Sequence, residues 1–357
     1  MSFDALLNVD DFEAAARARL APDAFDYYAG GAGDEVTLRR NREAWARLAL
    51  RYRVLRGVAR PVLAARVLGH DLSLPVLLAP TAFQGLAHPE GEVATARAAA
   101  AAGTIHVQSL LSSAALEQVT GAAPGRVFLQ LFMLRSRGLT EMLVARAEDA
   151  GCSALVVTVD APRPGRRERD LRRRLRLPVA AMLAHLLPGG LPPLGEAPGV
   201  SVFETLLQPG LSWADVEWLR GRTKLPIVLK GLVRGDDARL AAEHGAAAVV
   251  VSNHGGRQLD GAPATAEVLA EVVDAVAGAL EVWVDGGLRR GVDIVKALAL
   301  GARAVLVGRP TLWGLACGGE QGVARVLTLL REEIELALVL AGAHSPSDLT
   351  PDWLTRT

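Results

Sequence analysis

Short apolar runs alternate with alanine-rich amphipathic stretches over most of the chain. The runs are continuously apolar, which is typical of strands buried on both faces. They cover residues 75–79, 104–108, 127–131, 154–159, 226–230, 247–252, 281–285 and 303–308. Apolar positions recur at helical spacing in the stretches 91–102, 139–150, 213–221, 236–244 and 264–277.

This alternation predicts the fold class. Eight strands interleaved with helices predict an α/β fold, a parallel (β/α)8 TIM barrel over residues 75–341. A doubly wound open sheet is the alternative, and the count of eight strands disfavours it. Residues 1–74, with helical patterns over 9–50, are predicted as an N-terminal helical extension, so residues 1–357 are interpreted as one domain.

One interval between strands is much longer than the others. Residues 163–209, after the fourth strand, are rich first in arginine and then in Leu, Pro and Gly. Insertions of this length in compact domains are typically lids or disordered segments, so we expect a solvated lid. Contact of the basic run 172–174 and the apolar stretch 177–187 with a membrane surface is the alternative.

Charge and cysteine content narrow the class of protein. Lys and Arg number 39, as do Asp and Glu, so the charge does not favour nucleic acid as a partner. No apolar run reaches membrane-spanning length, and the two cysteines form neither a disulfide framework nor a metal-ligand pattern. We expect a cytoplasmic protein with no transmembrane segment and no metal site.

Polar groups follow nearly every predicted strand. The carboxyl ends of barrel strands share one face, and buried polar groups cost free energy unless they are paired, so the set indicates a functional site. The residues at these strand ends include Pro80, Thr81, Ala82, Ser109, Gln130, Phe132, Thr158, Asp160, Lys230, Ser252, Asn253, His254, Asp285, Gly287, Gly308 and Arg309.

The turn after the sixth strand carries His254 and, three residues later, Arg257. An imidazole moves protons near neutral pH, and a guanidinium binds a carboxylate with two parallel hydrogen bonds. The pair indicates proton removal from an anionic substrate. For this segment alone, a solvated histidine and a surface arginine in an ordinary strand-to-helix turn are the alternative.

Strands seven and eight end in glycines and arginines. Gly287 and Gly308 let backbone N–H groups approach a ligand, and Arg289 and Arg309 supply positive charge. The last two strands are the usual place for a phosphate in such barrels. A phosphate-bearing ligand is therefore expected, with phosphosugar and flavin chemistry both open.

These segments together resemble a known family. Residues 252–260, 285–290, 308–309, 158–167 and 25–29 are similar to those of the FMN-dependent 2-hydroxy-acid oxidases and dehydrogenases, which include glycolate, lactate and 4-hydroxymandelate oxidases. The resemblance covers almost the whole chain. It implies FMN as cofactor, a small-molecule 2-hydroxy acid as substrate and a homo-oligomer, a tetramer in this family.

The resemblance also implies roles for individual residues. His254 is the expected base and Asp160 orients it, while Tyr27, Arg257 and Arg167 bind the substrate carboxylate. Lys230 stabilises negative charge on the reduced flavin. The expected FMN contacts are Pro80, Thr81, Ala82, Ser109, Gln130, Thr158, Lys230, Ser252, Asp285, Gly287, Arg289, Gly308 and Arg309.

Two residues depart from the family pattern. Phe132 stands where most members carry tyrosine, so a hydroxyl that would bond the substrate is missing. Losing such a bond costs about 1–3 kcal/mol, which slows a reaction without abolishing it. Leu111 stands where glycolate oxidases carry tryptophan. The pocket is expected to be roomier and more apolar, which favours a 2-hydroxy acid larger than glycolate.

The expected activity is FMN-dependent oxidation of an (S)-2-hydroxy acid to the 2-oxo acid, with oxygen reoxidising the flavin and yielding peroxide. Another electron acceptor and oxidative decarboxylation of the product stay open. Two alternatives are an FMN-dependent isomerase or rearrangement barrel, in which the carboxylate clamp would be idle, and a weakened flavin-binding protein, which Phe132 alone supports.

Overall fold

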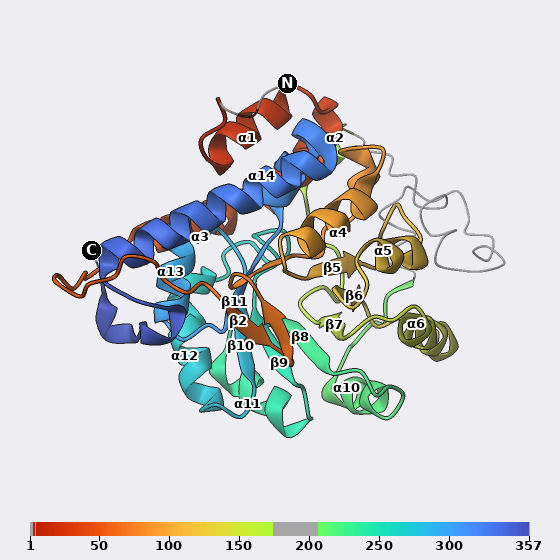
Figure 1. Cartoon of the computed structure of the whole chain (residues 1–357). Coiled ribbons are helices and arrows are strands. Elements are labelled where there is room, and N and C mark those ends of the chain that lie inside the picture. The colour runs from red at the N-terminus through yellow and green to blue at the C-terminus, as the bar shows by residue number, and fades with distance from the viewer. Residues whose placement is uncertain (1–2, 4, 174–205, 357) are drawn as a thin grey trace.

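Eight parallel strands close into a barrel in the computed structural model, which describes residues 3, 5–173 and 206–356. The strands follow one another around the barrel in chain order, and the last pairs with the first (Figure 1). All eight predicted strands are confirmed. They are β4 (Val76–Leu78), β5 (His106–Ser109), β6 (Val127–Leu131), β7 (Leu155–Thr158), β8 (Ile227–Leu232), β9 (Ala248–Val251), β10 (Glu281–Val284) and β11 (Ala304–Val307).

Helices surround the barrel, and the five predicted between strands are confirmed within two residues at each end. Among the described residues of the barrel region, the helices are α4 (Gly91–Ala101), α5 (Leu116–Ala122), α6 (Arg137–Asp149), α7 (Glu168–Arg173), α10 (Trp213–Arg220), α11 (Gly235–Glu243), α12 (Thr265–Val276), α13 (Gly291–Ala299) and α14 (Arg309–Ala341), with the 3-10 turn η1 (Gln84–Leu86).

Alternate strand residues fill the barrel interior. Phe128 of β6 and Trp283 of β10 stack there with ring centroids 6.3 Å apart. A hairpin formed by β2 (Ala65–Val67) and β3 (His70–Leu72) adds Val67 and Leu72 to the same apolar cluster. The interior is thus a packed core, which leaves the carboxyl ends of the strands as the open face.

The N-terminal extension contains α1 (Val9–Arg17), α2 (Pro22–Ala29) and α3 (Val36–Ala46). The predicted helical region 9–50 ends differently, because β1 (Leu48–Leu50) is a strand that pairs with β12 (Leu354–Arg356) near the C-terminus. Two 3-10 turns, η2 (Pro346–Asp348) and η3 (Pro351–Trp353), precede β12. Helix α14 packs against α1, α4 and α13 and so joins the extension to the barrel (Figure 1).

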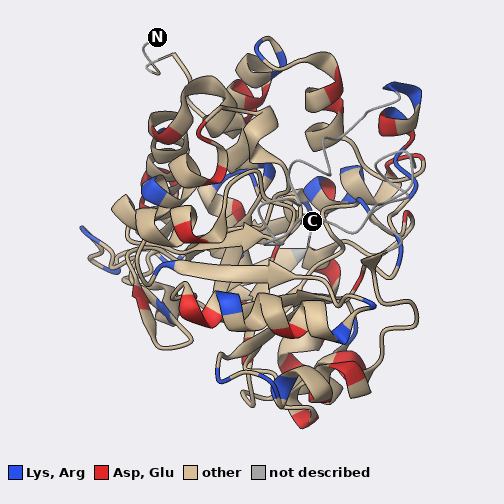
Figure 2. Cartoon of the chain, turned by 90° about the vertical axis from the view of Figure 1, so that its right-hand side faces the viewer, with Lys and Arg blue, Asp and Glu red and all other residues tan. Residues whose placement is uncertain are grey.

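Most of the predicted lid lies outside the described residues, as does the apolar stretch considered for membrane contact. Its first part, α7, is held to the extension by ion pairs of Arg169 with Glu35 (2.6 Å) and of Arg173 with Asp26 (2.7 Å). Acidic and basic positions are interspersed on the helices in the view of Figure 2. Among the described helices, none combines the length and apolarity needed to cross a membrane.

Candidate active site

The predicted base lies at the carboxyl end of β9, paired with a carboxylate from β7. His254 Nδ1 is 3.0 Å from Asp160 Oδ1. A carboxylate only accepts hydrogen bonds, so Nδ1 carries the proton and Nε2 is left as the basic nitrogen. Burial alone would raise the pKa of Asp160, but the charges of His254 and Lys230 hold it below its usual value. Asp160 is therefore an anion beside the imidazole.

Room for Asp160 depends on Gly231 in the neighbouring strand. The register of β8 against β9 shifts between Lys230 and Leu232, which marks a β-bulge at Gly231. Gly231 has φ +116°, and a Cβ there would lie 2.6 Å from both Cβ and Cγ of Asp160. A glycine is required, because any side chain would occupy the space of the carboxylate.

Three residues of the expected substrate clamp are stacked on one another. The guanidinium carbons of Arg257 and Arg167 lie 5.0 and 5.4 Å from the centre of the Tyr27 ring. Arg257 Nη1 donates to the carbonyl oxygens of Tyr27 (2.6 Å) and Gly30 (2.9 Å) at the end of α2. Burial, with the charge of Arg167, lowers the pKa of Arg257 to about 10, so a bound carboxylate would relieve the repulsion.

Lys230 is a buried cation at the end of β8. Its ammonium lies 2.9 Å from Asp285 Oδ2 and donates to Ser252 Oγ at 2.9 Å. Burial disfavours the charged form, but the carboxylates of Asp285 and Asp160 outweigh it and raise the pKa of Lys230. The charge is thus fixed at the cavity wall, where a cofactor could use it.

A chain of neutral polar side chains lines the wall at β5, β6 and β7. Ser109 Oγ donates to Gln130 Oε1 (3.3 Å), and Gln130 Nε2 donates to Thr158 Oγ1 (3.0 Å). Phe132 follows on the same wall and is 8% exposed, packed with an apolar cluster that includes Leu110 and Leu134. The wall changes here from hydrogen-bonding to apolar.

The end of the cavity at β10 and β11 has polar atoms available for a ligand. Among the described residues, Asp285 Oδ1 and Arg289 Nε are buried and have no hydrogen-bond partner. Gly287 has φ +82°, and a Cβ there would lie 2.2 Å from the Asn41 carbonyl oxygen. An unused acceptor and an unused guanidinium donor match the ribityl hydroxyls and phosphate of FMN, so these residues fit that cofactor.

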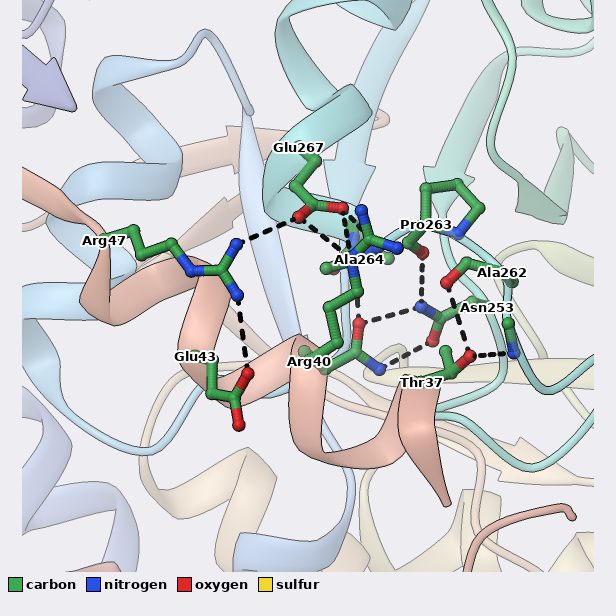
Figure 3. A network of polar contacts seen from close by, with 12 residues as sticks. Thr37, Arg40, Glu43, Arg47, Asn253, Ala262, Pro263, Ala264 and Glu267 are labelled. Atoms are coloured by element: carbon green, nitrogen blue, oxygen red, sulfur yellow. Dashed lines mark hydrogen bonds and ion pairs between the residues drawn. The ribbon is translucent and has the colours of Figure 1, made fainter. Parts of the chain in front are cut away.

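Helix α3 supports the turn after β9 through a network of polar contacts that includes Asn253 (Figure 3). The amides of Asn41 and Asn253 form two reciprocal hydrogen bonds of 2.8 Å, and Asn253 Nδ2 also donates to the Pro263 carbonyl. Arg40 pairs with Glu267 at 2.9 Å. The extension thus fixes the turn, and His254 holds a left-handed φ of +58° within it.

Most of the predicted site residues line one cavity. Asp160 and Ser252 do not line it and instead lie behind His254 and Lys230 as their hydrogen-bond partners. The predicted residues that line it are Tyr27, Pro80, Thr81, Ala82, Ser109, Gln130, Phe132, Thr158, Arg167, Lys230, His254, Arg257, Asp285, Gly287, Arg289, Gly308 and Arg309.

Two supporting residues, Gln258 and Gly231, were not predicted from the sequence. Gln258 Nε2 donates to the carbonyl oxygens of Asp160 (3.1 Å) and Arg163 (2.9 Å), so it holds the start of the segment after β7. Its place directly after Arg257 in the motif was the available signal. Gly231 was marked by its position after Lys230. Within the described residues, no three His, Cys, Asp or Glu side chains group as a metal ion requires.

Comparison with known proteins identifies the family. The sequence profile of the FMN-dependent dehydrogenases matches residues 16–356. The chain belongs to the FMN-dependent dehydrogenase family. It is 50% identical over 356 residues to an L-lactate oxidase of Nostoc sp., with 98% of each chain covered. It is 47% identical to glycolate oxidase 3 of Oryza sativa subsp. indica, covering 97% of this chain and 95% of the relative.

Comparison with solved structures supports the same family. A mandelate oxidase with (S)-4-hydroxymandelic acid superposes with a TM-score of 0.90 at 44% identity, covering 98% of this chain and 99% of the other. The resemblance drawn from the motifs is thereby confirmed, and the protein is an FMN-dependent oxidoreductase.

Proposed function

We propose that this protein oxidises an (S)-2-hydroxy acid to the 2-oxo acid, with FMN taking the electrons. The observation that carries the proposal is the meeting of a carboxylate-paired imidazole and a stacked Tyr27–Arg257 clamp in one cavity. Relatives named as oxidases of lactate and glycolate support it. A rearrangement barrel would leave the Arg257 clamp without a role.

Substrate binding follows from the cationic wall. Arg257 and Arg167 flank the Tyr27 ring, so a carboxylate placed there would face two guanidinium groups and one phenol. Bidentate binding of the carboxylate fixes its plane and brings C2 of the substrate to a defined position. The clamp therefore orients the 2-hydroxyl toward His254.

Proton transfer follows from the pairing of His254. Nε2 accepts the proton of the substrate 2-hydroxyl, and the Asp160 carboxylate 3.0 Å from Nδ1 stabilises the imidazolium that forms. When bound, FMN would take up the C2 hydrogen together with the two electrons of its bond. Lys230 holds a fixed positive charge at the wall, and Asp285 and Arg289 would hold the ribityl and phosphate groups.

The substrate is proposed to be larger than glycolate. Phe132 and Leu111 line the cavity and present apolar surface where a phenol and an indole are typical of glycolate oxidases. The similar structure with (S)-4-hydroxymandelic acid shows that this fold admits an aromatic substrate. A bulky or aromatic side chain would gain from burial against this wall.

Anaerobic mixing of the FMN-loaded protein with 2-hydroxy acids tests the proposal. Lactate, 2-hydroxy acids with longer side chains and mandelate should bleach the flavin with one equivalent each, and the 2-oxo acid should appear in the same amount. Glycolate should react more slowly. No bleaching with any member of the panel would exclude the activity.

Oxygen is proposed as the electron acceptor, in keeping with the relatives named oxidases. Oxygen consumption matched by peroxide supports this, whereas turnover only with a quinone or dye excludes it.

A cytoplasmic location is also proposed, since both Cys152 and Cys317 are free thiols. Cell fractionation tests the location.

Self-association as a homotetramer is proposed from the family resemblance, and exposed apolar residues near the end of α14 are proposed as part of the contact surface. Residues 51–62 lie along the end of α14, because Arg53 N donates to the Ala341 carbonyl and Val62 N to the His344 carbonyl. Leu55 is 100% exposed and Leu340 68%. Light scattering after gel filtration should give a tetramer that Leu340→Asp weakens.

A further inference from the structure

Three of the five N–H groups of the Arg309 guanidinium, one on each nitrogen, donate to the protein's own backbone, and Nη1 and Nη2 each keep one further N–H. Nε donates to the Tyr28 carbonyl (2.8 Å), Nη1 to the Gly255 carbonyl (3.1 Å) and Nη2 to the Gly30 carbonyl (2.9 Å). Each of the three nitrogens therefore has a partner before any ligand binds. This differs from Arg289, whose Nε has no partner among the described residues.

Two of these three acceptors lie at the end of α2. The carbonyls of a last helical turn have no partners within the helix and form the negative end of its dipole. Arg257 donates to the same end, to the carbonyls of Tyr27 and Gly30. Two guanidinium groups thus fix the helix that carries Tyr27.

The third acceptor lies in the turn that carries the base. Gly255 follows His254 directly and has φ +64°. A Cβ at Gly255 would lie 2.9 Å from Arg309 Nη1, so the turn is shaped around this guanidinium. Arg309 therefore links the end of α2 to the turn after β9, two segments 225 residues or more apart in sequence.

The first turns of α14 hold α2 at a second point. Trp313 stacks on Phe25 of α2, with ring centroids 5.2 Å apart and an angle of 22° between the planes. Helix α2 is thus held by a stacked ring at its middle and by a hydrogen-bonded guanidinium at its end. Loss of the Arg309 side chain would remove the donor to the Tyr28 carbonyl and one of the two donors to the Gly30 carbonyl, without removing the stacked ring.

We infer that Arg309 is a positioning residue that fixes Tyr27 relative to the turn carrying His254, so that both meet the substrate correctly. Of the two arginine side chains, Arg289 and not Arg309 provides the affinity for the FMN phosphate. The role of Arg309 in substrate binding, the substrate half of the inference, rests on the proposed function. The role of Arg289 in phosphate binding, the phosphate half, rests on the cofactor site alone. Arg289 and Arg309, which follow the neighbouring strands β10 and β11, thus have separate roles.

Flavin binding tests the phosphate half without any turnover. Apoprotein is titrated with FMN and with riboflavin, and flavin fluorescence gives the ratio of the two dissociation constants, which reports phosphate contacts. Arg289→Met should lower the preference for FMN at least about tenfold, the value of a hydrogen bond to a charged group. Arg309→Met should leave the ratio within about threefold of the parent protein.

Steady-state kinetics tests the substrate half. Arg309→Met should raise KM for lactate about tenfold or more and lower kcat less, and Arg309→Lys should recover part of the loss. In a Tyr27→Phe background the same substitution should have a smaller effect, because the group that Arg309 positions is already incomplete. A purely structural role would lower the folded fraction and leave KM unchanged.

Two results would overturn the inference. One is a loss of FMN preference in Arg309→Met as large as in Arg289→Met, which would make Arg309 a phosphate ligand. The other is an unchanged KM in folded Arg309→Met. Should that variant not fold, Arg309→Lys carries both comparisons. A parent protein that oxidises no 2-hydroxy acid would refute the proposed function instead, and the flavin ratio would still decide the phosphate half.

Discussion

Replacing Gly231 by alanine should separate the base from its carboxylate. The new Cβ would lie 2.6 Å from two Asp160 atoms, closer than the 3.0 Å below which a neighbour must shift. The neighbour cannot yield easily, since Cβ and the backbone N of Asp160 are both close. Asp160 must then move away from His254 or the β8 bulge must rearrange.

The expected loss of stability in Gly231→Ala has two contributions, backbone strain and overpacking. A non-glycine residue in a sparsely populated backbone region costs about 1–3 kcal/mol, and overpacking adds about 1–3 kcal/mol. Gly231→Ala should therefore lose roughly 2–6 kcal/mol of unfolding free energy. Flavin reduction by substrate should slow at least about 10²-fold, because the base loses its partner.

Gly151→Ala is the matched control. Gly151 has φ +80°, and no described atom lies within 4 Å of the position its Cβ would take. It should lose stability by backbone strain alone, with no change in reduction rate. Urea unfolding and anaerobic stopped-flow reduction give both quantities. A Gly231→Ala protein that reduces its flavin at the parent rate would refute the argument that this glycine makes room for Asp160.

Three further predictions concern single side chains. His254→Gln should keep FMN bound and reduce it about 10²–10⁴-fold more slowly, and a rate within a few-fold of the parent would remove His254 from the mechanism. Phe132→Tyr should shift the ratio of kcat/KM for lactate and mandelate toward lactate, whereas an unchanged ratio would show that Phe132 does not set substrate size. Burial lowers the pKa of His106 to about 4, against 6.5 for a free histidine. As pH falls, His106 therefore binds its proton near pH 6.5 in the unfolded state but only near pH 4 in the folded state. Its contribution to the free energy of unfolding is full above pH 6.5 and is lost toward pH 4. Between these pH values the free energy of unfolding should fall by about 1.4 kcal/mol per pH unit because of His106, and His106→Gln should lack this part of the fall. Urea unfolding across that range measures it, and equal slopes in the parent protein and the variant would contradict the prediction.

The barrel strands could be predicted because each is buried on both faces and reads as an unbroken apolar run. Helices α13 and α14 were not predicted as segments. Residues 291–299 carry two charged residues, Asp293 and Lys296, three positions apart among apolar ones, so a helical period was available in the sequence and was not used. In α14 the pattern is interrupted at Gly318 and Gly319, whose backbone angles are not helical. The β2–β3 hairpin was missed as well, because its strands are only three residues long.

Side-chain partners were harder to predict than elements. His254 and Asp160 end different strands, and the closure of the barrel brings them together, which a strand count can anticipate. The bonds of Arg309 to α2 depend on how the N-terminal extension docks, and no repeat or spacing encodes that docking. The bulge at Gly231 shifts the register of one strand, and a lone glycine does not reveal such a shift.

The pairing of β1 with β12 has a consequence for the order of events during synthesis. Leu48 and Arg356 pair across about 300 residues, which a ribosome adds in roughly 15–60 s. For that time α2, with Tyr27 on it, is already made while the strand that closes the extension does not yet exist. The sheet that closes the N-terminal extension therefore cannot form until synthesis of the chain is almost complete.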